Sequence, residues 1–254
     1  MTRTTQQLFD LTGKTALITG GSGALGLQMA HALGEAGARI MLSDHHADKL
    51  EAAMTELHDA GIDARWVVAD GAIEKDLEKL VGETLHRMGE VDILVNNAGH
   101  TRHAPAFESP LAEWDWVNSQ KLRGYLLLSQ LIGRQSMMGR GGSIINVACR
   151  LNTVAGDTSQ GAVIHFTRAL AREWGQHGIN VNAICPKWGA RSRLTGRPAA
   201  VGEACLETTT PLTTQEDGDE IKGVTLLFAS DAGRHITGQW LAVGARDCAV
   251  RELE

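Results

Sequence analysis

The sequence lacks the features that would place the chain in a membrane, in a secreted compartment or on nucleic acid. No apolar run approaches membrane-spanning length, and residues 1–10 are polar, without the apolar centre of a signal peptide. The 24 Lys and Arg residues are fewer than the 30 Asp and Glu residues, and the net charge is −6. Because both signs are interspersed, no basic face is available for nucleic acid or for an anionic membrane. We therefore expect neither partner, and we expect a cytoplasmic protein.

Patterns of paired cysteines and of metal ligands are also missing. The four cysteines are far apart and form no Cys-x-x-Cys pair, which indicates reduced thiols and no disulfide framework. The neighbouring His45 and His46 have no third ligand suggested near them in the sequence. The sequence therefore predicts no metal site.

What the sequence does contain is a regular alternation of short apolar segments and longer amphipathic ones. The apolar segments predict strands at 15–19, 39–43, 64–69, 92–95, 144–147, 180–184 and 240–243. Apolar spacing of three and four residues predicts helices at 24–36, 47–60, 74–87, 111–138, 159–174 and 216–229. Strands that alternate with helices of this length favour an α/β fold with a parallel sheet covered on both faces. We expect residues 1–254 to form a single domain.

Several motifs together resemble those of the short-chain dehydrogenase/reductase (SDR) family. They are TGGSxxLG at 19–26, NNAG at 96–99, INVA at 145–148 and SxGAVxxFTRALAxEWGxxGINVNAIxP at 159–186. The resemblance covers essentially the whole chain. It implies a Rossmann-type doubly wound parallel sheet with helices on both faces, and a nicotinamide dinucleotide site at the carboxyl ends of the strands.

The phosphate-binding loop implied by the resemblance is partly altered. Gly20 and Gly26 occupy two of the family's glycine positions, and Ala24 replaces the middle glycine with Gly23 beside it. The added methyl group lies where backbone and phosphate should approach closely, so we expect a weakened site. An equally simple interpretation is a turn that is retained only to pack the helix on the strand.

The adenosine side matches the family better. Asp44 follows the second strand, where a carboxylate binds ribose hydroxyls and disfavours a 2′-phosphate, which implies NAD in preference to NADP. Asp70 matches the family's adenine contact, and Asn97 to Gly99 match its ribose-side loop. The alternative for Asp44 is a helix N-cap or a solvated turn residue.

The catalytic side departs from the family at every position that the resemblance implies. The serine, tyrosine, lysine and asparagine positions hold Cys149, Gly156, Gln160 and Lys121, respectively. The chain has one tyrosine, Tyr125, and no Tyr-x-x-x-Lys pattern, so no shifted alignment restores the pair. These changes remove the proton donor and its partners, so we expect no catalytic residue. With Lys187 and Arg191 replacing residues on the nicotinamide side, we expect no bound cofactor or weak NAD binding.

The leading hypothesis is therefore a catalytically inactive SDR-like subunit with a structural or regulatory role. In the family, the helices at 111–138 and 157–175 form a subunit interface, which implies a homologous partner. That partner would be an active NAD-dependent paralogue that oxidises a secondary alcohol, such as a hydroxyacyl-CoA, in a heterotetramer, or a second copy of this chain. Two alternatives are an active NAD-dependent hydroxyl dehydrogenase or reductase with relocated acid–base residues, and a nucleotide-binding regulatory module.

Overall fold

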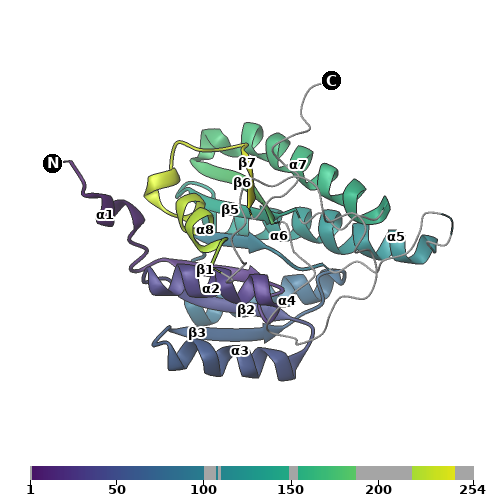
Figure 1. The fold of residues 1–254 in the computed structure, drawn as a ribbon, viewed down its shortest axis with the longest axis horizontal. Helices are drawn as coiled ribbons and strands as arrows, with labels where there is room; N and C mark the ends of the chain where they lie inside the picture. Colours follow the sequence, from purple (N-terminus) through teal and green to yellow (C-terminus); the bar gives the residue numbers. More distant parts are fainter. Residues whose placement is uncertain (1, 100–106, 108–109, 149–153, 187–218, 244–254) are drawn as a thin grey trace, which may run out of the picture.

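One parallel sheet organises the protein. The computed structural model describes residues 2–99, 107, 110–148, 154–186 and 219–243, and within α7 it leaves the side chains of 154–157 undescribed. In these residues, seven strands pair in the order β3-β2-β1-β4-β5-β6-β7, all parallel (Figure 1). The strands are β1 (Thr15–Thr19), β2 (Arg39–Asp44), β3 (Ala64–Val68), β4 (Ile93–Asn96), β5 (Gly142–Val147), β6 (Ile179–Pro186) and β7 (Trp240–Val243). The expected Rossmann-type fold is confirmed.

Helices cover both faces of this sheet (Figure 1). On one face lie α2 (Ala24–Glu35), α3 (Ala47–Asp59) and α8 (Lys222–Ala229). On the other lie α4 (Glu74–Met88), α6 (Gly124–Ile132) and α7 (Val154–Trp174). No helix in the described ranges combines the length and the apolar character needed to cross a membrane.

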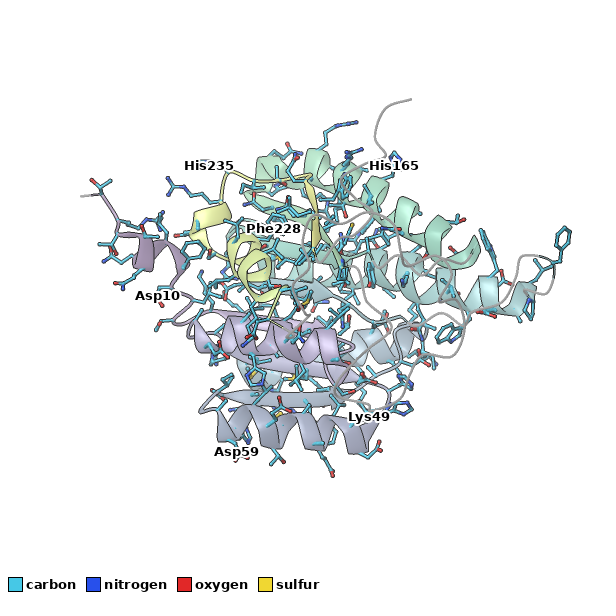
Figure 2. The ribbon with its side chains drawn as sticks, viewed as in Figure 1. Asp10, Lys49, Asp59, His165, Phe228 and His235 are labelled. Carbon is cyan, nitrogen blue, oxygen red and sulfur yellow. The ribbon has the colours of Figure 1, made fainter. Side chains whose placement is uncertain are left out.

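The core consists of two apolar layers, one on each side of the sheet. Successive strand residues alternate between the layers, as a pleated strand requires. Ile18 packs with the α2 side while its neighbour Leu17 packs with the α4 side, and both are fully buried. Figure 2 shows Phe228 of α8 in the interior, whereas Lys49 and Asp59 of α3 lie at the periphery.

The structure departs from the predicted elements in several places, among them the start of α7, which is at Val154 and not at residue 159. A short helix, α1 (Thr5–Phe9), begins with a capping box between Thr4 and Gln7 that the sequence contained but the prediction missed. The expected helix at 111–138 comprises α5 (Leu111–Asn118), a π-helical turn η1 (Ser119–Arg123), α6 and a second π-helical turn η2 (Gly133–Met137). Helix α8 begins at Lys222, whereas residues 219–221 form a turn and residues 216–218 lie outside the described part.

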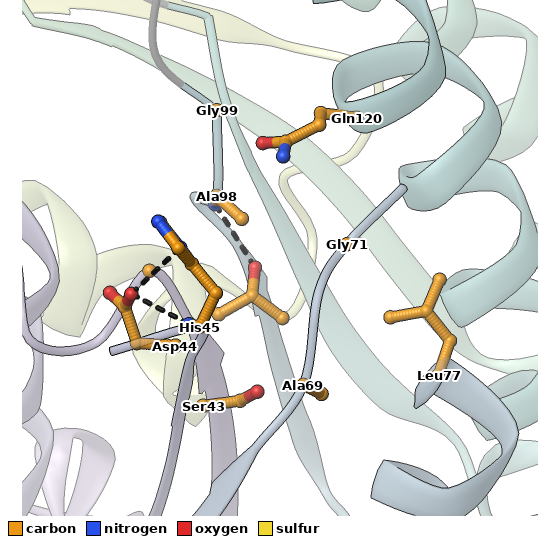
Figure 3. Close-up of a pocket in the computed structure, with 11 residues that line it drawn as sticks. Ser43, Asp44, His45, Ala69, Gly71, Leu77, Ala98, Gly99 and Gln120 are labelled. Carbon is orange, nitrogen blue, oxygen red and sulfur yellow. Dashed lines mark hydrogen bonds and ion pairs between the residues drawn. The ribbon is translucent and has the colours of Figure 1, made fainter. Parts of the chain in front are cut away.

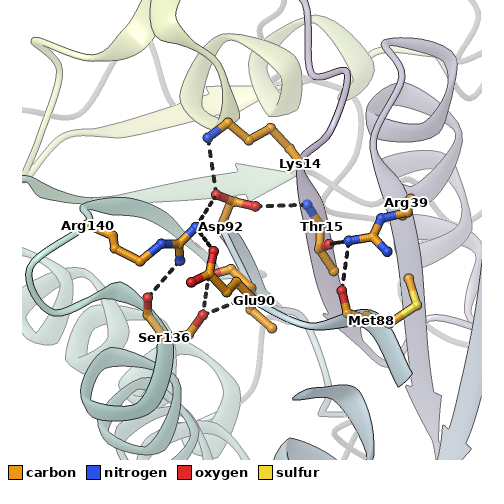
Figure 4. A network of polar contacts seen from close by, with 9 residues as sticks. Lys14, Thr15, Arg39, Met88, Glu90, Asp92, Ser136 and Arg140 are labelled. Carbon is orange, nitrogen blue, oxygen red and sulfur yellow. Dashed lines mark hydrogen bonds and ion pairs between the residues drawn. The ribbon is translucent and has the colours of Figure 1, made fainter. Parts of the chain in front are cut away.

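At the amino edge of the sheet, one carboxylate joins three segments of the chain. Asp92 accepts hydrogen bonds from the backbone N of Thr15 at 3.0 Å, from Lys14 Nζ at 3.1 Å and from Arg140 Nη2 at 3.2 Å (Figure 4). Its side chain is 13% exposed. Because its partners lie at the start of β1 and just before β5, Asp92 joins the beginnings of the two strands that flank β4.

Replacing Asp92 by alanine should lower the free energy of unfolding by about 2 kcal/mol, because a largely buried N–H and two cations lose their acceptor. Glu90→Ala is the matched control, since Glu90 also contacts Arg140, at 2.6 Å, but its side chain is 62% exposed. That change should cost at most about 1 kcal/mol. Urea denaturation of both variants measures the difference, and equal losses would contradict this account of Asp92.

Candidate functional site

The candidate site lies where the strand order reverses, between β1 and β4. The loops that leave these two strands are joined by side chains that bond to backbone. Asn97 Nδ2 donates to the carbonyl oxygens of Thr19 at 3.0 Å and Gly20 at 3.1 Å. In return, Thr19 Oγ1 accepts from the backbone N of Asn97 at 3.0 Å and of Ala98 at 3.1 Å. These four hydrogen bonds, the Asn97–Thr19 clamp, hold the two loops as one edge of a crevice.

The glycine loop packs tightly on the first turn of α2. A Cβ on Gly26 would lie 2.3 Å from the carbonyl oxygen of Gly20, which no side chain tolerates. Gly20 itself has a φ of +62°, a conformation that favours glycine. Helix α2 has Gly23 as its N-cap, and no side chain caps its first N–H groups. An uncapped helix start behind a glycine turn is a suitable anion site.

A narrow cleft opens beside this loop, between the carboxyl ends of β1, β2, β3 and β4 (Figure 3). It is lined by Thr19, Gly20, Ser43, Asp44, His45, Ala69, Gly71, Leu77, Ala98, Gly99 and Gln120. The ends of β1 and β2, the loops after β3 and β4, helix α4 and the π-helical turn η1 therefore contribute to one small pocket.

Asp44 lies at the rim of the cleft in a fixed orientation. Its Oδ2 accepts from Ser22 Oγ at 2.7 Å, and its Oδ1 accepts from the backbone N of His45 at 2.7 Å. The side chain is 9% exposed, which excludes a solvated turn residue. The N-cap of α3 is His46, so Asp44 is not the helix cap either. The contact with Ser22 ties the carboxylate to the glycine loop, and the sequence interpretation missed this partner.

Asp70, after β3, has its carboxylate held from two sides. Its Oδ1 accepts from the backbone N of Ala72 at 2.9 Å and from Gln120 Nε2 at 3.3 Å. Gln120 is 7% exposed and belongs to η1, far from β3 in the sequence. In the sequence, the only signal that could have suggested the contact of Gln120 with Asp70 is the position of Gln120 in the segment 119–121, Ser-Gln-Lys.

The four substituted catalytic positions lie in different places, and the structure does not describe all of them. Lys121 is buried in η1, and its side chain lies over Gly99. Gln160 is half-buried on α7. Gly156 falls within α7 at a position whose surroundings are not described, and Cys149 lies outside the described residues. Lys187 and Arg191 lie outside them as well.

The single tyrosine joins the ends of two strands. Tyr125 Oη lies 3.1 Å from the carbonyl oxygen of Ala98 and 3.3 Å from that of Val147, within hydrogen-bond reach of both. It therefore connects the loop after β4 with the end of β5. Lys121 precedes it by four residues on the same helical segment.

The structure thus brings the predicted cofactor residues to one edge of the sheet. They are Gly20, Gly26, Asp44, Asp70, Asn97 and Gly99. In the described ranges, no group of three or more His, Cys, Asp or Glu residues could hold a metal ion.

The comparisons with known proteins match this arrangement over nearly the whole chain. The sequence profile of the short chain dehydrogenase family matches residues 14–194. The chain belongs to the short chain dehydrogenase family. It is 31% identical over 245 residues to a 5-keto-D-gluconate 5-reductase of Escherichia coli, covering 93% of this chain and 96% of that protein. It is 33% identical to a D-threitol dehydrogenase of Mycolicibacterium smegmatis, covering 92% and 93% of the two chains.

A solved structure is similar in both sequence and shape. The gluconate 5-dehydrogenase of Burkholderia cenocepacia, in complex with NADP and tartrate, superposes with a TM-score of 0.84 at 30% identity. The match covers 94% of this chain and 97% of that one.

These findings overturn two expectations drawn from the substituted positions. The expectation of a catalytically inactive subunit that is not itself an enzyme is wrong, because relatives that match more than nine-tenths of this chain are named as dehydrogenases and reductases. The expectation of no bound cofactor, or only weak NAD, is also wrong, because the similar solved structure holds NADP. The physical reason is that the absence of the Tyr-x-x-x-Lys pattern excludes only the acid–base chemistry of those two side chains. The strands and loops that form the cleft are still present. No finding tests the expected heterotetramer with an active paralogue, which stays a prediction.

The close packing of the glycine loop gives a direct test of this frame. Gly26→Ala should lower the free energy of unfolding by about 1–3 kcal/mol, because the new methyl group forces the loop away from α2. Gly82→Ala, in α4, is the matched control, since nothing lies within 4 Å of its Cβ position. That substitution should raise stability by about 0.5–1 kcal/mol. Thermal or urea unfolding compares them, and a neutral Gly26→Ala would contradict the loop geometry.

Proposed function

We propose that the chain is a nicotinamide-dependent oxidoreductase that interconverts a secondary hydroxyl and a ketone on a polyol or a sugar acid. The observation that carries this proposal is the fixed carboxylate of Asp44 at the rim of a cleft beside an uncapped helix start. The substrate class is supported by the relatives, which are named for 5-keto-D-gluconate and D-threitol.

The residues of the cleft fit a dinucleotide. The first turn of α2 offers free N–H groups for the pyrophosphate, behind the turn at Gly20. Asp44 is placed to accept hydrogen bonds from the adenosine ribose hydroxyls. Its negative charge would repel a 2′-phosphate, so we propose NAD(H) for this chain, although the similar solved structure holds NADP. When bound, the nicotinamide ring supplies or accepts the hydride.

Steady-state assays test the proposal directly. The purified chain is given NAD⁺ with threitol, galactitol or gluconate, and NADH with 5-keto-D-gluconate, and NADH absorbance is followed. We expect sustained turnover with at least one of them. A mock purification from the same host without this chain controls for contaminating dehydrogenases. Absence of turnover with all four, using either NAD(H) or NADP(H), would contradict the proposal.

The role of Asp44 predicts a change in cofactor preference. Asp44→Ala should raise the dissociation constant of NAD by about tenfold, because two charge-assisted hydrogen bonds to ribose are lost. Binding of NADP should improve in the same variant, since the repulsion of the 2′-phosphate disappears. Asp48→Ala is the control, because Asp48 is an exposed carboxylate four residues further on, in the first turn of α3. Calorimetry with both dinucleotides compares the variants, and unchanged preference in Asp44→Ala would contradict this role.

We also propose that the protein forms a homo-oligomer in the cytoplasm, through the surfaces of α6 and α7. Leu126 on α6 is 41% exposed, beside the half-buried Leu127 and Leu131. A second copy of this chain would cover this apolar strip with the same strip of its own. Phe166 on α7, by contrast, packs against two core clusters, so its substitution would test folding more than assembly. Cys185 is buried and takes part in no disulfide, which fits a reducing compartment.

Leu126→Asp should therefore shift the protein from oligomer to monomer, because an unpaired carboxylate would enter an apolar contact. Val68→Asp is the matched control, since Val68 has a similar exposure of 37% but lies on β3, at the other edge of the sheet from α7. Light scattering coupled to size exclusion measures both. A monomeric wild-type chain, or an unaffected Leu126→Asp, would contradict the proposed interface.

A further inference from the structure

Strand β3 forms one edge of the sheet. It pairs with β2 on one side, and no strand in the described ranges pairs with it on the other (Figure 1). A groove of about 690 Å³ is lined by all five residues of β3, by Met54 of α3 and by three charged residues of α4. No described residue lines both this groove and the cleft beside the glycine loop. The groove is therefore a second hollow, at the edge of the sheet.

The backbone groups of alternate residues in β3 point to opposite sides. The carbonyl oxygen of Asp63 and the N–H of Ala69 both bond to β2, at 2.8 Å and 3.0 Å. Because the direction of these groups alternates along a strand, the odd-numbered residues of this segment face β2. The N–H and C=O groups of Ala64, Trp66 and Val68 are therefore directed away from β2, toward the free side.

The protein closes only part of this free edge. The carbonyl oxygen of Ala64 lies 3.1 Å from His58 Nε2. Among the described residues, none bonds to the outward backbone groups of Trp66 and Val68. Proteins often close such edges with prolines or bulges, but β3 has no proline and its register with β2 is unbroken. Two N–H donors and two C=O acceptors are thus available to an added strand.

The two faces of this edge differ in chemistry. Trp66 packs against the core layer on the α3 side, whereas Val67 belongs to the layer on the α4 side. Since side chains alternate along a strand, Val68 shares the α3 side with Trp66, and it is 37% exposed. Arg65 lies on the α4 side, where its Nη1 donates to the carbonyl oxygen of Arg87 at 3.1 Å. The edge is therefore apolar on the α3 side and basic on the α4 side.

The charges of the groove favour an acidic occupant. Glu83 is the acidic residue among the described ones that line it, and it pairs with Arg87 at 2.7 Å. Arg65 and Lys79 are exposed, and neither pairs with a carboxylate in the described part of the chain. A second copy of this chain would bring the same two cations to the edge, and like charges across a sheet repel. A segment with carboxylates would neutralise them.

We propose that β3 binds an extended segment of a partner protein, which adds to the sheet as a further strand. The segment alternates apolar side chains, which cover Trp66 and Val68, with acidic ones, which pair with Arg65 and Lys79. Main-chain hydrogen bonds to the outward groups of β3 supply affinity, and the alternation supplies specificity. This interaction goes beyond the proposed oxidoreductase function and does not depend on it.

The probe is a fluorescein-labelled synthetic peptide, Gly-Val-Glu-Val-Glu-Val-Gly, added to the purified chain while fluorescence anisotropy is followed. We expect saturable binding, and none for the peptide that has lysine in place of glutamate. Two further peptides are N-methylated, one at the valines and the other at the glutamates. Only one of these two sets of N–H groups faces β3 in an added strand. One methylated peptide should therefore lose binding while the other keeps it.

Variants of the groove identify the site. Lys79→Glu and Arg65→Glu should each weaken binding of the glutamate peptide by about three- to tenfold. The double variant should instead bind the lysine peptide. Lys49→Glu is the matched control, because Lys49 is an exposed lysine of α3 that does not line the groove. Val68→Pro removes an outward N–H and should weaken binding by about fivefold or more. Urea unfolding establishes that each variant is folded.

Contrary results separate the other interpretations. No binding of the glutamate peptide to the wild-type chain would overturn the inference, and the cations would then serve only to protect the edge. Equal binding of the two methylated peptides would overturn strand addition. Unchanged binding in both charge-reversal variants would place the peptide elsewhere. Light scattering that shows self-association of the wild-type chain, lost in Val68→Pro, would assign the edge to a second copy.

Discussion

The Asn97–Thr19 clamp is the constraint on which the candidate site depends. Parallel strands that diverge at a reversal of order leave a crevice, but they do not by themselves fix its two walls. Here the side chain of Asn97 and the hydroxyl of Thr19 supply hydrogen bonds in both directions between the loops after β1 and β4. The glycine loop and the loop that carries Gly99 are therefore held in one fixed relation. Every other element of the site is positioned relative to this edge.

The two ends of the sheet have separate tasks. At the amino end, Asp92 joins segments that precede neighbouring strands, and its donors are protein groups. At the carboxyl end, Asp44 and the start of α2 present charge and N–H groups toward a cleft. The contacts that stabilise the fold and the groups that would bind a ligand thus lie at opposite ends of the strands. Catalytic side chains at one end can therefore change without loss of the frame at the other.

Much of the fold can be predicted from the sequence, because short apolar segments that end at glycine or aspartate are compatible with few structures other than buried strands. The expected strands at 15–19 and 240–243 have the observed bounds, and the remaining strands differ from the expected ones by a few residues. The π-helical turn η1 could not be predicted, because its spacing depends on packing against the loop after β4. The Asp70 and Gln120 contact was missed for the same reason, since it joins segments distant in sequence.

The interpretation of function from sequence was wrong where it treated a missing pattern as missing chemistry. Lys121 was noted only as a replacement for asparagine, whereas its burial is visible only in the structure. The central claim, that this chain oxidises a hydroxyl with a nicotinamide dinucleotide, is tested most directly by isotope transfer. Purified protein is incubated with NAD⁺ and a polyol deuterated at its secondary carbons, and the dinucleotide is analysed by mass spectrometry. The account predicts reduced dinucleotide that carries one deuterium from the substrate. Dinucleotide that stays oxidised and unlabelled with every polyol and sugar acid tested would contradict it.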